Sequence, residues 1–259
     1  MQKDEILLKK APKLNQNDSG RLVMASPLDF GIADNELTSY VTPDCQSIIP
    51  ISRTASLRSS VQWGDIPIPA SIFHSTYKVN SSAYIGELPY ATETEIERNT
   101  KRYACAVTAL FSVAGRLYLN GKPLITATSM FGQLPDWNEY ISIWSATNTT
   151  TAYIKNGIEY GSTKSNDLGP GFVSYCNNKG YNLQESHAGA PIFEQFKQQI
   201  ANNCNSIFTA QAISNGSTVG HSMAVAGWVD ATRTPGNDPA VGHSYLYVYD
   251  GWNGMAYID

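Results

Sequence analysis

The chain has 259 residues, enough to bury a sizeable core in one large domain. Its 18 Lys and Arg against 22 Asp and Glu give a net charge of −4, and charged residues make up 15% of the chain, below the roughly 25% of an average globular domain. The sequence lacks a basic run with interleaved aromatics, which argues against a nucleic-acid partner. No segment approaches the roughly 20 consecutive apolar residues of a membrane span.

The four cysteines are Cys45, Cys105, Cys176 and Cys204. Their spacing does not match a zinc site, so we expect neither a metal nor another cofactor. If one cysteine is catalytic, the remaining three form at most one intramolecular disulfide, and we expect Cys176 to pair with Cys204.

Residues 1–60 mix charged, Pro-rich and Ser/Thr-rich pieces with little periodicity, and we interpret them as an N-terminal extension. The extension is a propeptide, a substrate-guiding segment or a set of strands that completes the fold. Its start lacks a signal peptide. Because the chain favours Ser, Thr, Asn, Gly and Tyr, we expect a secreted protein shown without its leader; a cytoplasmic protein is the alternative.

Residues 61–259 are expected to form the main domain. Short strands and loops are predicted over 61–90. The first clear helix follows Cys105, where apolar residues recur at helical spacing and Gly115 is the predicted C-terminal cap. The stretch after it is read as irregular, with a loop at 148–151.

In the second half of the chain, the pattern of apolar residues changes from that of a helix to that of strands. A helix is predicted over 191–202, with Pro191 at its first position and an apolar stripe along one face. Strands are predicted over 222–228 and 245–249 because both are rich in Val, Ala, Tyr and Leu, and a turn-rich loop over 234–239 separates them.

Cys105 is placed by this pattern at a helix N-terminus. Unpaired backbone N–H groups and the helix dipole favour a thiolate there, and the thiolate is the nucleophilic form. Free cysteines are also among the most buried residue types, so a core cysteine is the alternative.

His221 opens the predicted strand over 222–228. Thiol catalysis needs an imidazole that takes the thiol proton and later protonates the leaving amine. Its small neighbours Gly220, Ser222 and Ala224 predict a ring exposed in a cleft; a structural histidine is the alternative.

Asp250 ends the next predicted strand and precedes Gly251 and Trp252. A carboxylate there can accept the second ring N–H of the histidine while the indole shields the bond from water; an ordinary Asp-Gly turn is the alternative. His221 lies 29 residues earlier (250 minus 221), enough for a strand, a loop and a returning strand. His243 shares a Val-Gly-His-Ser context but lies on the same strand as Asp250, about 23 Å away along it.

The order of these segments resembles the papain-like cysteine peptidases, specifically their streptopain-like and bacteriocin-leader-processing bacterial branches. The resemblance covers about residues 95–255 and rests on Cys105-Ala-Val-Thr-Ala, on Gly220-His221-Ser222 and on Asp250-Gly-Trp252. It implies an α+β fold in which a central helix carries the nucleophile and packs against an antiparallel sheet. It also implies hydrolysis of peptide bonds through a thioester on Cys105, with His221 as general base and acid and Asp250 orienting it.

One departure concerns the oxyanion donor. Papain-like enzymes usually carry a glutamine about six positions before the cysteine, where this chain has Asn99. Asn99 can donate the same kind of hydrogen bond from a shorter arm, beside the Cys105 backbone N–H; a solvent-facing polar residue is the alternative.

The implied partner is a protein or peptide substrate, and no sequence feature determines the oligomeric state. The same triad serves amidases, acyltransferases and deconjugating enzymes. A non-catalytic secreted binding or toxin module is the rival from another class.

Overall fold

The computed structural model describes residues 38–42, 68–70, 73–74, 77–86, 88–120, 136–189, 191–214, 217–233, 242–252 and 254–258. The fold is α+β, as the sequence predicts. Its helices are α3 (Glu93–Thr100), α4 (Cys105–Leu119), α5 (Trp137–Ala146), α6 (Ser165–Asn178) and α7 (Phe193–Ala201). Its strands are β1 (Thr38–Thr42), β2 (Ile68–Pro69), β3 (Tyr77–Tyr84), β4 (Arg102–Tyr103), β5 (Thr150–Lys155), β6 (Ile158–Ser162), β7 (Ser186–Gly189), β8 (Asn205–Ser214), β9 (Ser217–Arg233), β10 (Gly242–Tyr249) and β11 (Met255–Ile258).

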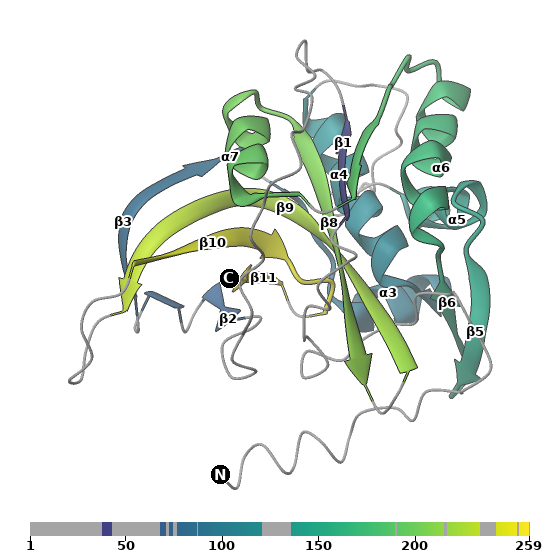
Figure 1. The fold of residues 1–259 in the computed structure, drawn as a ribbon. Helices are drawn as coiled ribbons and strands as arrows, with labels where there is room; N and C mark the ends of the chain where they lie inside the picture. The colour runs from purple at the N-terminus through teal and green to yellow at the C-terminus, as the bar shows by residue number, and fades with distance from the viewer. Residues whose placement is uncertain are drawn as a thin grey trace, which may run out of the picture.

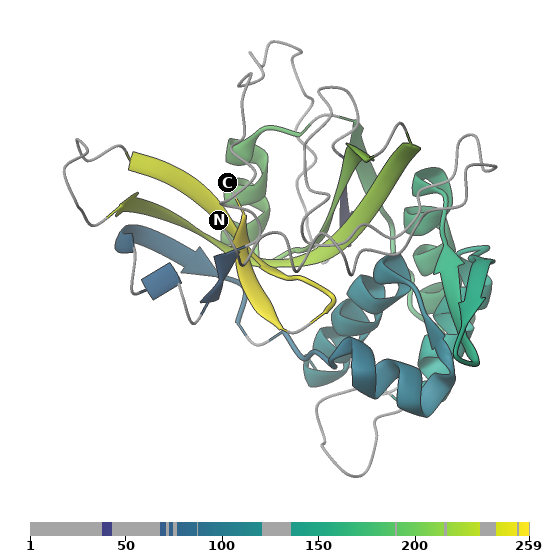
Figure 2. The ribbon, with the colours of Figure 1, turned by 90° about the horizontal axis from the view of Figure 1, so that it is seen from below.

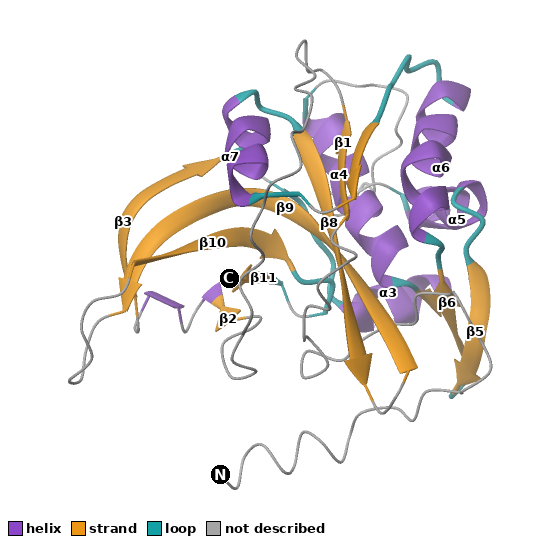
Figure 3. Ribbon diagram, viewed as in Figure 1, coloured by secondary structure: helices purple, strands orange, loops and turns teal. Residues whose placement is uncertain are grey.

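The larger sheet has the strand order β2-β11-β10-β9-β8-β1-β7, with β3 also paired to β9, and all its pairs are antiparallel. The smaller sheet has the order β4-β6-β5. Figures 1 and 3 show α3, α4, α5 and α6 gathered on one side of the molecule, with β3, β10 and the later part of the curved strand β9 on the other. The turned view in Figure 2 shows the same separation.

Strand β9 is the longest strand and joins two parts of the sheet. Its first part, 217–225, pairs with β8, and its later part, 227–233, pairs with β3. β10 runs along its other edge, opposite 224–232. The far part covers an aromatic cluster in which Phe73 stacks on Tyr77 and Tyr257. The predicted strands over 222–228 and 245–249 are confirmed, and both are longer than predicted.

Helix α4 lies in the core. Every residue from 106 to 117 is buried, including the polar side chains of Thr108, Ser112 and Arg116, which recur at helical spacing. It packs against β9, β8 and α5. The predicted end at Gly115 is wrong, because the helix continues to Leu119; with neighbours on all sides, packing outweighs the roughly 1 kcal/mol penalty of one interior glycine.

The middle of the chain is more regular than predicted. Helices α5 and α6 flank the β5–β6 hairpin, and β5 begins within the stretch interpreted as a loop, at Thr150. The predicted helix over 191–202 is α7, which begins at Phe193 rather than at Pro191. The loop predicted over 234–239 lies outside the described residues.

Part of the predicted N-terminal extension belongs to the large sheet. β1 pairs with β7 on one side and with β8 on the other. Of the three roles considered for residues 1–60, these five residues complete the fold.

The expected disulfide is wrong. Cys176 is a buried free thiol in α6, and Cys105 is free as well. Cys204 is disulfide-bonded, so its partner is neither of these two. Among the helices described, none combines the length and apolarity needed to cross a membrane.

Candidate active site

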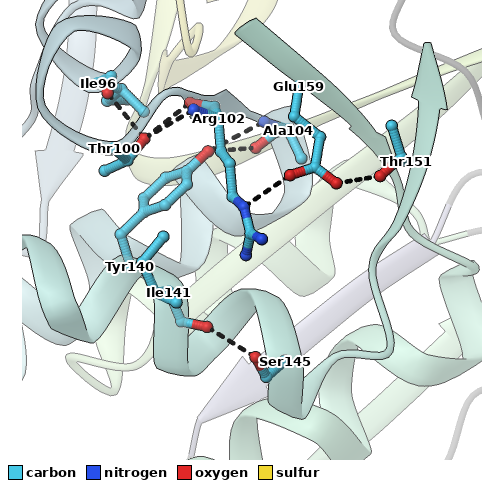
Figure 4. Close-up of polar contacts among 9 residues, drawn as sticks. All are labelled: Ile96, Thr100, Arg102, Ala104, Tyr140, Ile141, Ser145, Thr151 and Glu159. Atoms are coloured by element: carbon cyan, nitrogen blue, oxygen red, sulfur yellow. Dashed lines mark hydrogen bonds and ion pairs between the residues drawn. The ribbon is translucent and has the colours of Figure 1, made fainter. Parts of the chain in front are cut away.

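The residues just before Cys105 are fixed from both sides (Figure 4). β4 runs parallel to β6, and the Arg102 guanidinium forms an ion pair with Glu159, with 2.8 Å between Nε and Oε2. Directly after β4, the Ala104 N–H donates to the Tyr140 hydroxyl over 2.9 Å. Ala104 is the N-cap residue of α4, so Cys105 becomes the first residue of that helix.

The Cys105 sulfur lies against the start of its own helix and against β9. The backbone groups of Ser222, Ala106 and Cys105 lie close enough to the sulfur to lower its pKa. Burial opposes them and is the larger effect, raising the pKa of the thiol to about 11. The thiol is therefore neutral at pH 7, contrary to the thiolate expected from the helix N-terminus alone. Ser222 follows His221, so this contact brings the nucleophile to the residue beside the expected base.

His221 is fully buried. The Trp252 ring stacks on the imidazole with centroids 3.8 Å apart and an interplanar angle of 2°. The ring predicted to be exposed in a cleft is thus covered by the indole of the turn that follows Asp250. Burial lowers the pKa of His221 to about 3, so the imidazole is neutral at pH 7.

His221 and Asp250 are adjacent, but not through the expected atom. His221 Nε2 lies 2.5 Å from the Asp250 backbone carbonyl oxygen. A carbonyl can only accept, so Nε2 carries the hydrogen, and in the neutral ring Nδ1 is the basic nitrogen. Asp250 therefore orients the imidazole through its main chain.

The Asp250 carboxylate instead shapes the turn. Its Oδ1 accepts the Trp252 N–H over 2.8 Å and the Gly254 N–H over 3.1 Å. Asp250 thus has both of the roles considered for it. Its carboxylate stabilises the turn, and its backbone carbonyl, rather than the expected carboxylate, contacts His221.

The structure does not bring Asn99 to the site. Asn99 is exposed on α3, and its Nδ2 donates to the Glu95 carbonyl over 2.7 Å, one helical turn earlier. The amide is used within its own helix, which is the solvent-facing alternative considered for it. The expected oxyanion role has no geometric support.

Glu93 is the residue that sequence reasoning missed. It opens α3 after a capping box formed by Thr92 and Glu95, and its backbone N–H donates to the Trp252 carbonyl over 3.0 Å. Burial is the largest influence on its carboxyl, followed by the charge of Glu97, and together with Asp250 they raise its pKa to about 7. The capping pattern Thr-x-x-Glu was visible in the sequence, but the burial that gives Glu93 its pKa was not.

The remaining histidines lie elsewhere. His243 faces Ala231 at the opposite end of β10 from Asp250, as its spacing predicts. His187 is on β7, and His74 lies 3.4 Å from the Tyr257 hydroxyl. Within the described part of the chain, no group of three or more His, Cys, Asp or Glu side chains is arranged to hold a metal ion.

Comparison of the chain with protein-family models, curated proteins and solved structures finds no match.

Proposed function

We propose that this protein is a secreted cysteine peptidase with a papain-like arrangement, in which Cys105 attacks the peptide carbonyl and His221 carries the proton. The observation that carries the proposal is the closeness of the Ser222 backbone to the Cys105 sulfur, which lowers the pKa of the thiol. This contact joins the helix that carries the nucleophile to the strand that carries the base. The disulfide at Cys204 supports secretion, since disulfides persist in oxidising compartments.

The protonation states define the order of events. At pH 7 the resting pair is a neutral thiol and a neutral imidazole, because burial raises the pKa of Cys105 and lowers that of His221. As sulfur bonds to the carbonyl carbon, the thiol proton moves to Nδ1 of His221. That proton then passes to the departing amine as the C–N bond breaks and leaves a thioester. Water, deprotonated by His221, displaces the thiol and releases the acid.

Alkylation of Cys105 by iodoacetamide, followed by mass spectrometry across pH 5 to 9, tests this pair. A base-assisted thiol reacts at a rate that changes little over this range, because His221 is unprotonated well above pH 3. His221→Ala removes the base, and we expect labelling at pH 7 to fall by roughly 100-fold or more. The remaining rate should rise with pH toward the thiol pKa of about 11.

His243→Ala is the matched control, since His243 shares the local sequence of His221 and lies at the other end of β10. It should label like the parent protein. Equal labelling of Cys105 in the parent and in His221→Ala would contradict the proposed pair.

Peptide hydrolysis needs its own test. The protein is incubated with a library of unstructured peptides, and new termini are identified by mass spectrometry, with Cys105→Ala as the blank. Cleavage by the parent alone supports the peptidase. Base-assisted labelling without cleavage would mean that the same residues catalyse another acyl reaction.

The full burial of His221 favours a second candidate, a non-catalytic secreted binding module in which the same residues form part of the core. In that case Cys105 should react as slowly as Cys176, the buried thiol of α6, whose pKa burial raises to about 12.

A further inference from the structure

Three hydrogen bonds attach the segment from Tyr249 to Trp252 to the helical side of the molecule. The Tyr249 hydroxyl donates to the Ala91 carbonyl, and the Glu93 N–H donates to the Trp252 carbonyl. Between them, the Tyr103 hydroxyl donates to the Gly251 carbonyl. The outer two bonds hold the ends of the segment, and Tyr103 holds its middle.

The middle of this segment is where His221 is oriented. Gly251 lies between Asp250, whose carbonyl faces His221 Nε2, and Trp252, whose ring covers the imidazole. A change in the Gly251 peptide therefore moves both groups that fix the histidine ring.

Gly251 is closely surrounded, and its backbone conformation favours glycine. Its φ is +82°, a conformation that residues with a Cβ rarely adopt. A Cβ at this position would lie 3.3 Å from the Tyr103 hydroxyl and 3.6 Å from His221 Cε1. The tyrosine hydroxyl and the imidazole thus both lie beside Gly251.

Tyr103 also belongs to the segment that carries the nucleophile. It is fully buried, ends β4 and lies two residues before Cys105. One short stretch of chain thereby holds the thiol at one end and the turn that orients the base at the other.

We propose that Tyr103 is a positioning residue that holds the Asp250–Trp252 turn against His221, so that Nε2 stays bonded to the Asp250 carbonyl and Nδ1 serves Cys105. This inference rests on the proposed function, because it assigns a role within the same Cys105–His221 pair. It predicts that loss of one hydroxyl, which touches neither reacting atom, weakens the base.

Tyr103→Phe tests the proposal, since it keeps the ring and removes only the donor. The matched control is Tyr175→Phe, in which a buried hydroxyl bonded to Glu139 at 2.7 Å is lost away from the site. For each variant we would measure the melting temperature, Cys105 alkylation from pH 5 to 9, and the ¹⁵N resonances of the His221 side chain, which identify the protonated ring nitrogen.

We expect Tyr103→Phe to slow alkylation at pH 7 by about tenfold, part of what general-base assistance supplies. The His221 resonances should change from one Nε2–H form to a mixture of tautomers. Tyr175→Phe should lower the melting temperature at least as much, because its hydroxyl binds a carboxylate, and yet keep the parent alkylation rate and resonances.

Parent-like alkylation and parent-like resonances in Tyr103→Phe would overturn the proposal. An equal loss of alkylation in Tyr175→Phe would also overturn it, because general destabilisation would then be the cause. If Tyr103→Phe does not fold, Gly251→Ala decides, since it keeps the hydroxyl but strains the φ of +82° and crowds the bond between that hydroxyl and the turn. It should give slower alkylation, and a parent-like rate would overturn the proposal.

The two proposals fail separately. If His221→Ala labels like the parent, the Cys105–His221 pair is wrong, whereas the tautomer of His221 still reports whether Tyr103 positions the ring. If His221→Ala is slow and Tyr103→Phe is not, the pair stands and only the role of Tyr103 falls.

Discussion

Two neighbouring groups at the site depart from their usual proton affinities in opposite senses. Burial keeps His221 neutral, and the same effect, reinforced by Glu97 and Asp250, keeps Glu93 partly protonated near pH 7. Perturbed groups that share a small region are typical of functional sites, although structural networks perturb pKa values too. At this scale the chemistry depends on which atom of each residue makes which contact.

Asp250 shows this most clearly, because its backbone carbonyl contacts His221 while its carboxylate accepts hydrogen bonds within the turn. Asp250→Asn keeps an oxygen that can accept the Trp252 and Gly254 N–H groups, so we expect Cys105 alkylation within a few-fold of the parent. Asp250→Ala removes the acceptor and leaves these buried donors unpaired, at a cost of about 1–3 kcal/mol each. Alkylation should fall by tenfold or more. Equal losses in both variants would instead assign the direct role to the carboxylate charge.

Glu93 should leave a signature in the pH dependence of unfolding. Its folded pKa of about 7 lies above the usual 4.5, so its favourable contribution is fully present below pH 4.5 and is lost as pH rises through 7. Glu93→Gln stays neutral, and its free energy of unfolding relative to the parent should increase by about 1–2 kcal/mol between pH 4.5 and 8. Partial exposure screens the full effect of about 1.4 kcal/mol per pKa unit.

Denaturant melts at several pH values measure this difference. Glu194→Gln is the control, because Glu194 also lies in the first turn of a helix but has a side chain that is 74% exposed. The expectation for Glu93 is contradicted if the two variants show the same pH dependence.

At the scale of elements, the contact between α5 and α6 depends on a glycine. A Cβ on Gly171 would lie 2.6 Å from both the Ala146 carbonyl oxygen and the Thr147 Cα, which are backbone atoms that cannot turn aside. Gly→Ala within a helix normally gains up to about 1 kcal/mol. Here we expect Gly171→Ala to lose about 1–3 kcal/mol of unfolding free energy through overpacking.

Gly242→Ala is the matched control for that substitution. A Cβ at Gly242 meets nothing within 4 Å, so its free energy of unfolding should stay within about 0.5 kcal/mol of the parent. A stability gain in Gly171→Ala would show that the helices can move apart.

The elements that the sequence predicts are those with strong local patterns. α4 and α7 carry apolar residues at helical spacing, and β9 and β10 are dense in β-branched and aromatic residues. α6 was missed because Gly169-Pro170-Gly171 reads as a helix breaker, although tertiary contacts keep it helical. β1 was missed because its partners lie far along the chain.

The candidate site was likewise predicted only in part. Chain order and the 29-residue spacing predict that His221 and Asp250 are neighbours, because an antiparallel return leaves few other arrangements. Whether the carbonyl or the carboxylate of Asp250 contacts His221 depends on the geometry of the turn, which residue spacing does not predict. The burial of His221 and the pKa of Glu93 arise from packing by distant segments. The hydrogen bond of Asn99 to the carbonyl four residues earlier depends on its position in a helix that the sequence analysis did not predict.

For the whole molecule, the boundary predicted at residue 60 cuts through the sheet. Val41 pairs with Ser186 on one side and Ser206 on the other. Val41→Pro removes a backbone donor from an interior strand, and we expect it to cost about 3 kcal/mol or more. Val41→Ala keeps the N–H and is the control, with thermal unfolding followed by circular dichroism. Similar melting temperatures for the two variants would place β1 outside the cooperative unit.

The position of β1 also means that this strand is synthesised long before the strands with which it pairs. Thr38 pairs with Gly189, so 151 residues (189 minus 38) are made before the first partner strand is complete. At about 5–20 residues per second, this wait lasts on the order of 8–30 s. Throughout it, the nascent strand offers unpaired edges to any other chain nearby. β1 thus remains unpaired until β7 and β8 have been made, and high-level expression should favour aggregation during that interval.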